Sequence, residues 1–334
     1  MLPPVSLNPP PKRKMIAVGE LLVDLVSSAP DVSLKDAPGF VKAPGGAPAN
    51  VAVAAGRLGL ATAFVGKVGT DAFGDFLEET VREAGVDTSG LVRSVEARTT
   101  LAFIATRSDG RKDIAFYRNP GADMLLTPDE LPKEALAECR CLHFGSVSLS
   151  QEPARSATLA AARLARDDGA LISFDPNWRP ALWDDHEEAR TVIRKAMRLA
   201  HVVKLADEEM EFVMGTDDAS AAAQAVLDAG PALCFITHGP GGASFLGRMG
   251  SGFVEGYSVD VVDTLGAGDA FMGAVLAEIV NNRDPLYLSE GNLHRITRRG
   301  NAAGAITCTK VGVIPSLPTM SELDTFLAGK DSER

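Results

Sequence analysis

A run of small residues, Gly266 to Gly268, stands before Asp269 at the start of an apolar, helix-forming stretch, and it combines two kinds of chemistry. A helix N-terminus has unpaired backbone N–H groups and about half a positive charge. Gly266, Ala267 and Gly268 have little side chain to hinder an anion, so their amides could form an anion hole for a transferring phosphoryl group. Asp269 would then accept the proton of the attacking hydroxyl, as the catalytic-loop aspartate of protein kinases does. The alternative is a simple helix cap.

A second glycine run, "PGGAPAN", suits a neutral polar ligand such as a sugar. Gly45 and Gly46 allow the backbone to approach a ligand closely, and the amide of Asn50 can both donate and accept hydrogen bonds. Asp24, in the first apolar stretch, offers carboxylate oxygens to paired hydroxyls. Each of these residues also has a structural interpretation, as a turn former or helix cap.

A third glycine run, "HGPGGASF", follows Thr237 and matches neither common nucleotide motif. Counted from Gly239, the last position of the dinucleotide pattern G-x-G-x-x-G is Ser244. The pattern G-x-x-x-x-G-K-[ST] occurs nowhere in the chain, which argues against a P-loop enzyme. The run could be a hairpin turn, or a loop that packs against a flat ring and phosphates.

Composition narrows the class of protein. The 334 residues carry a formal charge of −11, which argues against nucleic acid as a partner. No apolar run approaches the roughly 18 residues of a membrane span. The four cysteines do not suggest a disulfide framework, so we expect a cytoplasmic protein. Cys139, Cys141 and His143 alternate and could share one strand face, but the spacing is not a usual zinc pattern, and we favour packing.

The elements that must position these residues alternate between strand and helix from about residue 139 onwards. Such repeats predict a mostly parallel sheet with helices on both faces, and ligands bind such sheets at the carboxyl ends of the strands. Met15–Val26 is predicted as one strand. Residues 98–118 are predicted as a hairpin that turns at "SDG" and joins the Asp31–Val41 segment in a small overhanging sheet. Polar residues are predicted at the ligand-binding edge: Asp24, Asp175, Asn177, Thr237 and Asp269.

Taken together, the motifs resemble those of the ribokinase-like (PfkB) carbohydrate kinases, and among them the fructokinases. The two signatures are "GGAPANVAVAAGRLG" and "DTLGAGDAFMGAVL", with "FVGKVGTDAFG", "RTTLAF", "FYRNPGADMLLT" and "FDPNWRPALW" between them and "GVIPSLPT" after them. The resemblance runs from about Met15 to Thr319. It implies a three-layer α/β sandwich with a small β-sheet lid built from about residues 31–43 and 98–118. We expect a kinase domain over residues 15–325, with a disordered N-terminal tail at 1–14 and a C-terminal tail at 326–334.

The resemblance implies transfer of the γ-phosphoryl group of ATP to the 6-hydroxyl of fructose. Asp269 would be the base, with Gly266, Ala267 and Gly268 as the anion hole. The expected sugar-binding residues are Asp24, Gly45, Gly46, Asn50, Phe103, Arg118, Asn177 and Arg179. The expected ATP-binding residues are Lys204, Thr237, Gly239, Gly242, Gly268 and Asn301. Mg²⁺ would be held mainly by the ATP phosphates, with Glu209 acting through water, and Asp263 with the loop Lys310–Gly312 matches a K⁺ site of many relatives.

The chain departs from its resemblance at Ala206, where relatives usually carry Asn or Ser, and this weakens the assignment of Glu209. The alternative is another sugar substrate, such as 2-keto-3-deoxygluconate or ribose; Arg118 and Arg179 motivate it, because arginine pairs well with the carboxylate of a sugar acid. A second alternative, a kinase-like protein without turnover, is disfavoured because the GAGD run is intact. The resemblance also implies a homodimer formed through the lid.

Overall fold

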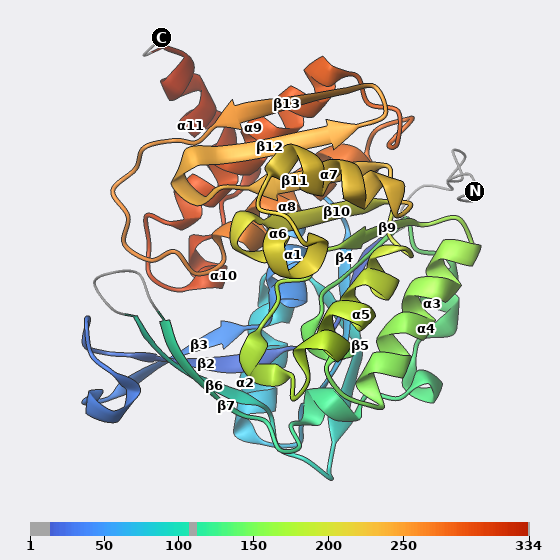
Figure 1. The fold of residues 1–334 in the computed structure, drawn as a ribbon. Coiled ribbons are helices and arrows are strands. Elements are labelled where there is room, and N and C mark those ends of the chain that lie inside the picture. Colours follow the sequence, from blue (N-terminus) through green and yellow to red (C-terminus); the bar gives the residue numbers. More distant parts are fainter. Residues whose placement is uncertain (1–13, 107–111, 333–334) are drawn as a thin grey trace.

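The computed structural model describes residues 14–106 and 112–332, and a nine-stranded sheet forms the centre of the molecule (Figure 1). Its strand order is β13-β12-β11-β10-β9-β8-β1-β4-β5, and all neighbours are parallel except β11-β12 and β12-β13. The strands are β1 (Met15–Val18), β4 (Thr62–Gly69), β5 (Asp87–Ser94), β8 (Cys141–Phe144), β9 (Leu171–Phe174), β10 (Val202–Ala206), β11 (Leu233–Thr237), β12 (Gly242–Gly247) and β13 (Gly250–Glu255). The central strands are fully buried, as strands with both faces covered must be.

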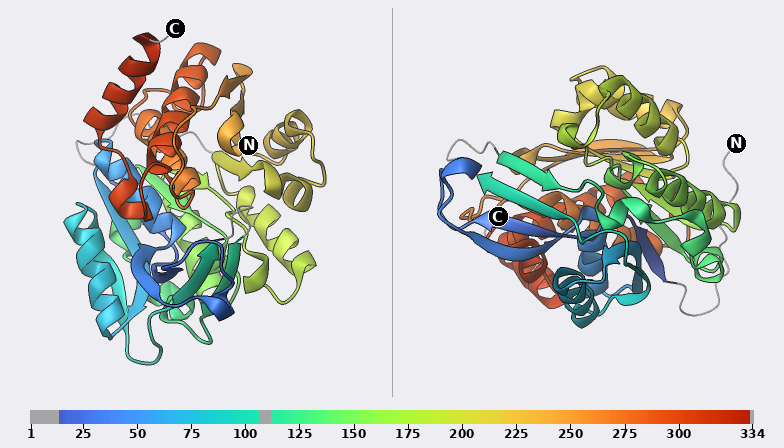
Figure 2. Two further views of the ribbon diagram at one scale, coloured as in Figure 1. Left: turned by 90° about the vertical axis from the view of Figure 1, so that its left-hand side faces the viewer. Right: turned by 90° about the horizontal axis from the view of Figure 1, so that it is seen from below.

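Helices cover both faces of this sheet, as the two views of Figure 2 show. One buried cluster packs α1 (Ala47–Arg57), α2 (Ala72–Glu83), α8 (Ala267–Val280), α9 (Glu290–Thr307) and α11 (Met320–Ser332) on one face. The other cluster packs α3 (Lys133–Ala137), α4 (Ala154–Asp167), α5 (His186–Met197), α6 (Asp207–Met214) and α7 (Ala219–Asp228) on the opposite face. The one-turn helix α10 (Val313–Ser316) follows α9. The predicted three-layer sandwich is confirmed. No helix in the described ranges is long and apolar enough to cross a membrane.

A separate four-stranded sheet forms the lid, in the order β3-β2-β6-β7 (Figure 1). Its strands are β2 (Leu22–Ser27), β3 (Phe40–Gly45), β6 (Leu101–Thr106) and β7 (Lys112–Tyr117). The predicted hairpin is confirmed by the antiparallel pairing of β6 and β7, whereas its "SDG" turn lies outside the described residues.

The predicted single strand Met15–Val26 is wrong, because the chain leaves the main sheet after Val18 and enters the lid at Leu22. Gly19, with a φ of 153° and Pro48 packed against it, stands at this crossing. Asp24 therefore belongs to the lid and not to the edge of the main sheet. The lid is also larger than expected, since β2 lies outside the predicted ranges and the chain from residue 31 to 39 contributes only a short 3-10 turn, Leu34–Asp36.

The C-terminal boundary also differs from the prediction. Helix α11 continues to Ser332, and Leu327 is buried in the core, so the folded chain extends past the expected boundary at 325. The predicted N-terminal tail falls almost entirely outside the described residues. The run after Thr237 proves to be the turn of the β11–β12 hairpin.

Candidate functional site

The first turn of α8 places Asp269 beside the glycine run. Gly266 adopts a left-handed φ of 77° just before the helix begins at Ala267, and a side chain there would collide with Val313. Asp269 is only 7% exposed, and burial raises its pKa to about 6 despite an opposing hydrogen bond from Asn50. A carboxyl group with this pKa is mostly ionised at neutral pH, yet it is a stronger base than an ordinary aspartate.

The most direct partner of Asp269 comes from the other glycine motif. Asn50, in the first turn of α1, donates from Nδ2 to Asp269 Oδ2 over 2.8 Å. The Oδ1 atom of Asn50 is buried and accepts no hydrogen bond from the described residues. Sequence reasoning placed Asn50 against the sugar and missed its contact with Asp269, because no local pattern reports a pair separated by 219 positions.

A buried lysine places positive charge at the same helix end. The Nζ atom of Lys204, on β10, lies 3.0 Å from Asp175 Oδ2, and a Cβ at Gly268 would come within 3.0 Å of that Nζ. Burial alone would lower the pKa of Lys204, but the charges of Asp175 and Glu209 outweigh burial and raise it. Lys204 thus stays charged beside the helix N-terminus.

The loop after β9 surrounds this group from a second side. Asp175 is its first residue, and Asn177 has a left-handed φ of 43°, with its backbone N–H donating to Asp175 Oδ1 over 3.2 Å. Arg179 folds back to donate to the carbonyls of Asn177 and Trp178, and its charge lowers the pKa of Asp269. The structure therefore brings Asp175, Asn177 and Arg179 to the neighbourhood of Asp269.

The lid contributes Asp24 next to the second glycine motif. A Cβ at Gly45 would lie 2.3 Å from Asp24 Oδ2, so the carboxylate covers the Gly45 backbone as only glycine permits. Phe103 is not brought to this place. Asp24 is the register partner of Ala102, so Phe103 projects from the opposite face of the lid, where its ring meets Phe40 and Tyr117 at 5.0 Å each.

Arg118 also departs from the predicted arrangement, because its side chain is buried in a closed network. Its Nε donates to Asp123 Oδ2 over 2.7 Å, and its terminal nitrogens contact Ser150 and the carbonyl of Val147. Thr100 donates to the other oxygen of Asp123. This guanidinium is committed to partners within the protein.

Four of the predicted ATP-binding residues, Thr237, Gly239, Gly242 and Asn301, lie around the β11–β12 turn and the end of β13, whereas Gly268 lies beside Lys204 at the start of α8. Asn301, on α9, donates to the carbonyls of Val254 and Glu255 over 2.9 and 3.1 Å. Gly242, at a φ of 119°, passes so close to the Val254 carbonyl that a Cβ would lie 2.1 Å from it. Thr237 and Gly239 precede Gly242 in the same hairpin turn.

The two candidate cation-binding residues are held by backbone N–H groups. Asp263 accepts from Leu265 N through Oδ1 and from Gly312 N through Oδ2, over 2.9 and 3.2 Å, and so joins the two predicted loops. Glu209 accepts from Ala206 N and from Trp178 N. Burial and Asp175 raise the pKa of Glu209, and Lys204 opposes them.

No metal-binding cluster of three or more His, Cys, Asp or Glu side chains occurs within residues 14–106 and 112–332. His143 instead pairs with Ser173 at 2.9 Å inside the sheet, and burial lowers its pKa to about 4. Cys139 and Cys141 are buried. The packing interpretation of this segment is therefore consistent with the structure.

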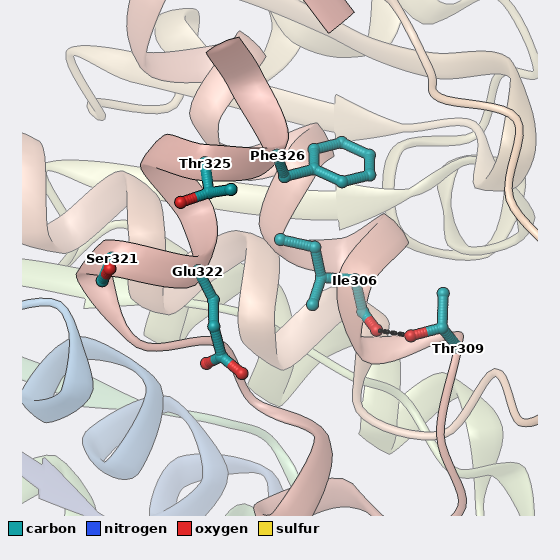
Figure 3. Close-up of a pocket in the computed structure, with 6 residues that line it drawn as sticks. All are labelled: Ile306, Thr309, Ser321, Glu322, Thr325 and Phe326. Atoms are coloured by element: carbon teal, nitrogen blue, oxygen red, sulfur yellow. Dashed lines mark hydrogen bonds between the residues drawn. The ribbon is translucent and has the colours of Figure 1, made fainter. Parts of the chain in front are cut away.

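A hollow of about 390 Å³ lies between the end of α9 and α11 (Figure 3). It is lined by Ile306, Thr309, Ser321, Glu322, Thr325 and Phe326. None of these residues was singled out from the sequence. Glu322 Oε1 lies 3.6 Å from Lys310 Nζ, so the hollow adjoins the loop Lys310–Gly312, whose Gly312 N–H donates to Asp263.

Comparison with known proteins finds a family model and relatives that match most of the chain. Residues 12–320 match the pfkB family carbohydrate kinase description. The chain is 46% identical to "Probable fructokinase-4" of Arabidopsis thaliana over 95% of its own length and 98% of the relative.

Among solved structures, a fructokinase of Xylella fastidiosa with bound ATP superposes with a TM-score of 0.87 at 34% identity, covering 96% of this chain and 99% of that one. A fructokinase double mutant of Vibrio cholerae, bound to fructose, ADP and potassium, has a TM-score of 0.83 at 32% identity, with 95% and 100% covered. The motifs, the fold and these similarities lead to one conclusion: the chain belongs to the pfkB family of carbohydrate kinases.

Proposed function

We propose that this kinase transfers the γ-phosphoryl group of ATP to the 6-hydroxyl of D-fructose. The observation that carries the proposal is the position of Asp269, a buried carboxylate with a pKa raised to about 6, in the first turn of a helix that begins with glycine. The names of the relatives, all fructokinases in the comparisons above, support fructose as the acceptor.

In this proposal Asp269 accepts the proton of the sugar hydroxyl through Oδ1, while Asn50 holds Oδ2. Fixing one oxygen leaves the other in a defined direction, which is what a general base requires. The raised pKa brings the base closer to the working pH and so increases its driving force for proton transfer.

Charge that develops on the transferring group would be stabilised by the Gly266–Gly268 amides and by Lys204. A helix N-terminus attracts anions, and the Lys204 ammonium lies against the same turn. Both groups are held in place before the reaction, so they need no reorganisation as charge develops.

On the acceptor side, the sugar-binding residues that the structure supports are Asp24, Gly45, Gly46, Asn50, Asn177 and Arg179. Asp24 covers Gly45, two residues before α1 begins, and the same helix carries Asn50. The alternative of a sugar acid loses one of its two motives, since Arg118 is already paired with Asp123. Phe103, on the opposite lid face, is better placed for contacts of the lid surface.

The nucleotide would lie along Thr237, Gly239 and Gly242 towards Asn301. Without a cluster of three acidic ligands in the described part of the chain, Mg²⁺ would take its oxygens from ATP and water and would neutralise phosphate charge. The Asp263 carboxylate, fixed by the N–H groups of Leu265 and Gly312, fits a monovalent cation. Such a cation would stabilise the loop that leads into α8.

We also propose a homodimer formed through the lid, in the cytoplasm. The lid face opposite Asp24 carries the cluster of Phe40, Phe103 and Tyr117, in which Tyr117 is 68% exposed. Aromatic residues are favoured in protein interfaces. Four cysteines in a chain of 334 residues do not suggest a disulfide framework, which supports a reducing compartment. Light scattering of wild type and Tyr117→Glu tests the dimer, which the charge should weaken.

The function is tested by ADP release from Mg-ATP in the presence of a panel of sugars. We expect fructose to give the highest kcat/KM, with the product phosphorylated at the 6-position by NMR. A strong preference for a sugar acid would instead establish the alternative substrate. Failure of every sugar to stimulate ADP release would overturn the enzymatic proposal.

A further inference from the structure

The loop Asp175–Arg179 is held in place by residues that are distant from it in the sequence. It lacks regular hydrogen bonding, and its middle residue, Asn177, has a left-handed φ that non-glycine residues rarely adopt. Such a conformation persists only where the surroundings enforce it. On one side, Ser146 N donates to the carbonyl of Pro176 over 3.1 Å.

On the other side, Glu209 bridges the loop to the start of α6. Its Oε1 accepts from Trp178 N over 2.6 Å, and its Oε2 accepts from Ala206 N over 2.8 Å. The side chain is buried, so both bonds form where water does not compete. Ala206, at the N-cap of α6, has no side chain that could accept a hydrogen bond. Glu209 therefore provides the side-chain hydrogen bond at this end of α6 as well as the one to the loop.

A ring contact reinforces the bridge three residues further along α6. The ring of Trp178 stacks on Phe212 with centroids 3.6 Å apart and planes 6° from parallel. Glu209 and Phe212 thus hold the same loop residue, one by its backbone N–H and the other by its side chain. This arrangement restrains both the position and the rotation of Trp178.

The charges that the loop carries act directly on the proposed base. Asp175 raises the pKa of Asp269, Arg179 lowers it, and Asp175 also pairs with Lys204. Movement of the loop would change the environment of Asp269 and displace the residues assigned to the sugar. The position of this loop is therefore a determinant of acceptor binding.

We propose that Glu209 is a positioning residue for the acceptor: its carboxylate clamps the Asp175–Arg179 loop to the start of α6. This rests on the proposed function, since the loop matters through Asp269 and the sugar. It differs from the role inferred by resemblance, a contact to Mg²⁺ through water. Each carboxylate oxygen retains a second lone pair, so experiment and not geometry separates the two roles.

The first experiment compares Glu209→Gln with Glu208→Gln, the same chemical change at the exposed neighbouring position. The amide of Gln can accept only one of the two backbone bonds and presents an NH₂ group to the other. We expect kcat/KM for fructose to fall about tenfold to a hundredfold, the effect of losing a charge-assisted hydrogen bond. The Mg²⁺ activation constant should stay at the wild-type value, and Glu208→Gln should resemble wild type in both.

A rise in the Mg²⁺ activation constant with an unchanged fructose KM would overturn the clamp. If both quantities change, Phe212→Leu decides, because it removes the ring contact and leaves the carboxylate intact. A fall in kcat/KM for fructose in Phe212→Leu, with normal Mg²⁺ activation, supports the clamp. Normal fructose kinetics in that variant would overturn it.

A second readout does not require turnover. In a Trp183→Phe background, Trp178 is the remaining tryptophan, and acrylamide quenching reports its accessibility. We expect Glu209→Gln to increase quenching while circular dichroism stays that of a folded protein. Unchanged quenching would refute the clamp. Lack of fructose phosphorylation by wild type would refute the proposed function alone, because the quenching result is independent of it.

Discussion

Two buried groups of charged side chains, one at the base of the lid and one at the start of α8, differ in how well their charges are satisfied. Arg118 and Asp123 form a closed pair in which both carboxylate oxygens and all three guanidinium nitrogens have protein partners. At the start of α8, one lysine faces Asp175, Glu209 and Asp269, and the pKa of Asp269 is raised. A closed pair has little left to offer a ligand, whereas an unbalanced group can bind one. This difference agrees with the proposed chemical role of the group at the start of α8.

The largest effect should come from Asp269→Asn, which removes the proposed base from the group at the start of α8. We expect kcat to fall about 10²- to 10⁴-fold, the contribution of a positioned base, with a much smaller change in the KM values. Steady-state kinetics with fructose and ATP measures both. Turnover close to wild type would remove the assignment of the base.

Substitution in the closed pair of Arg118 and Asp123 should instead lower stability. Arg118→Met leaves Asp123 buried without its cation, which should lower the free energy of unfolding by about 3–5 kcal/mol. Urea unfolding measures this loss. Arg179→Met, in the unbalanced group, should instead lower kcat/KM and leave stability near the wild-type value. If Arg118→Met were as stable as wild type but failed to bind sugar, Arg118 would belong to the site as the sequence suggested.

Glu20 offers a further test, because its buried carboxyl group lies near Arg118 and Asp123 but Arg118 does not neutralise its charge. Its Oε1 accepts from Ala47 N, and burial raises its pKa to about 7. A carboxyl group whose pKa is raised on folding favours the folded state at low pH and loses that contribution as pH rises through 7.

Glu20→Gln should therefore increase the free energy of unfolding at pH 8 by about 1–3 kcal/mol and have less effect at pH 5. Urea unfolding at the two pH values measures this. An equal effect at both would show that the charge of Glu20 is not what destabilises the wild type.

The smallest effect concerns the pH dependence of the reaction. Because Asp269 must be ionised to accept a proton and its pKa is about 6, kcat/KM should decline below pH 6, by about tenfold per pH unit. Initial rates between pH 4 and 8 test this. If kcat/KM declined only near pH 4, the pKa of Asp269 would not be raised and its carboxylate would not be held as the structure indicates.

The glycine motifs, the helices that follow them and the lid hairpin were predictable because their signals are local. Gly45, Gly46 and the GAGD run each combine turn residues with an adjacent apolar helix. The strand break at Gly19 was not predicted, since apolar residues lie on both sides of Gly19 and Glu20 and the packing of two separate sheets divides β1 from β2.

Side-chain partners were harder to predict than elements. The pairing of Asn50 with Asp269 joins two helices from opposite ends of the chain. In the sequence alone, Arg118 does not differ from a surface arginine, so its burial and its pairing with Asp123 were not predicted. Phe103 was expected beside the sugar together with Asp24, and only the strand register, which pairs Asp24 with Ala102, reveals that the two side chains lie on opposite faces of the small sheet.

The crossing at Gly19 separates Asp24 from Asp269, with the first on the small sheet and the second on the large body. In the proposed function, the small sheet thus contributes Asp24 to acceptor binding, while the large body carries the proposed base together with Asn50, Asn177 and Arg179. On this proposal, substitutions on the four short strands could alter the part of acceptor binding that depends on Asp24 while α8 and the proposed base stayed the same.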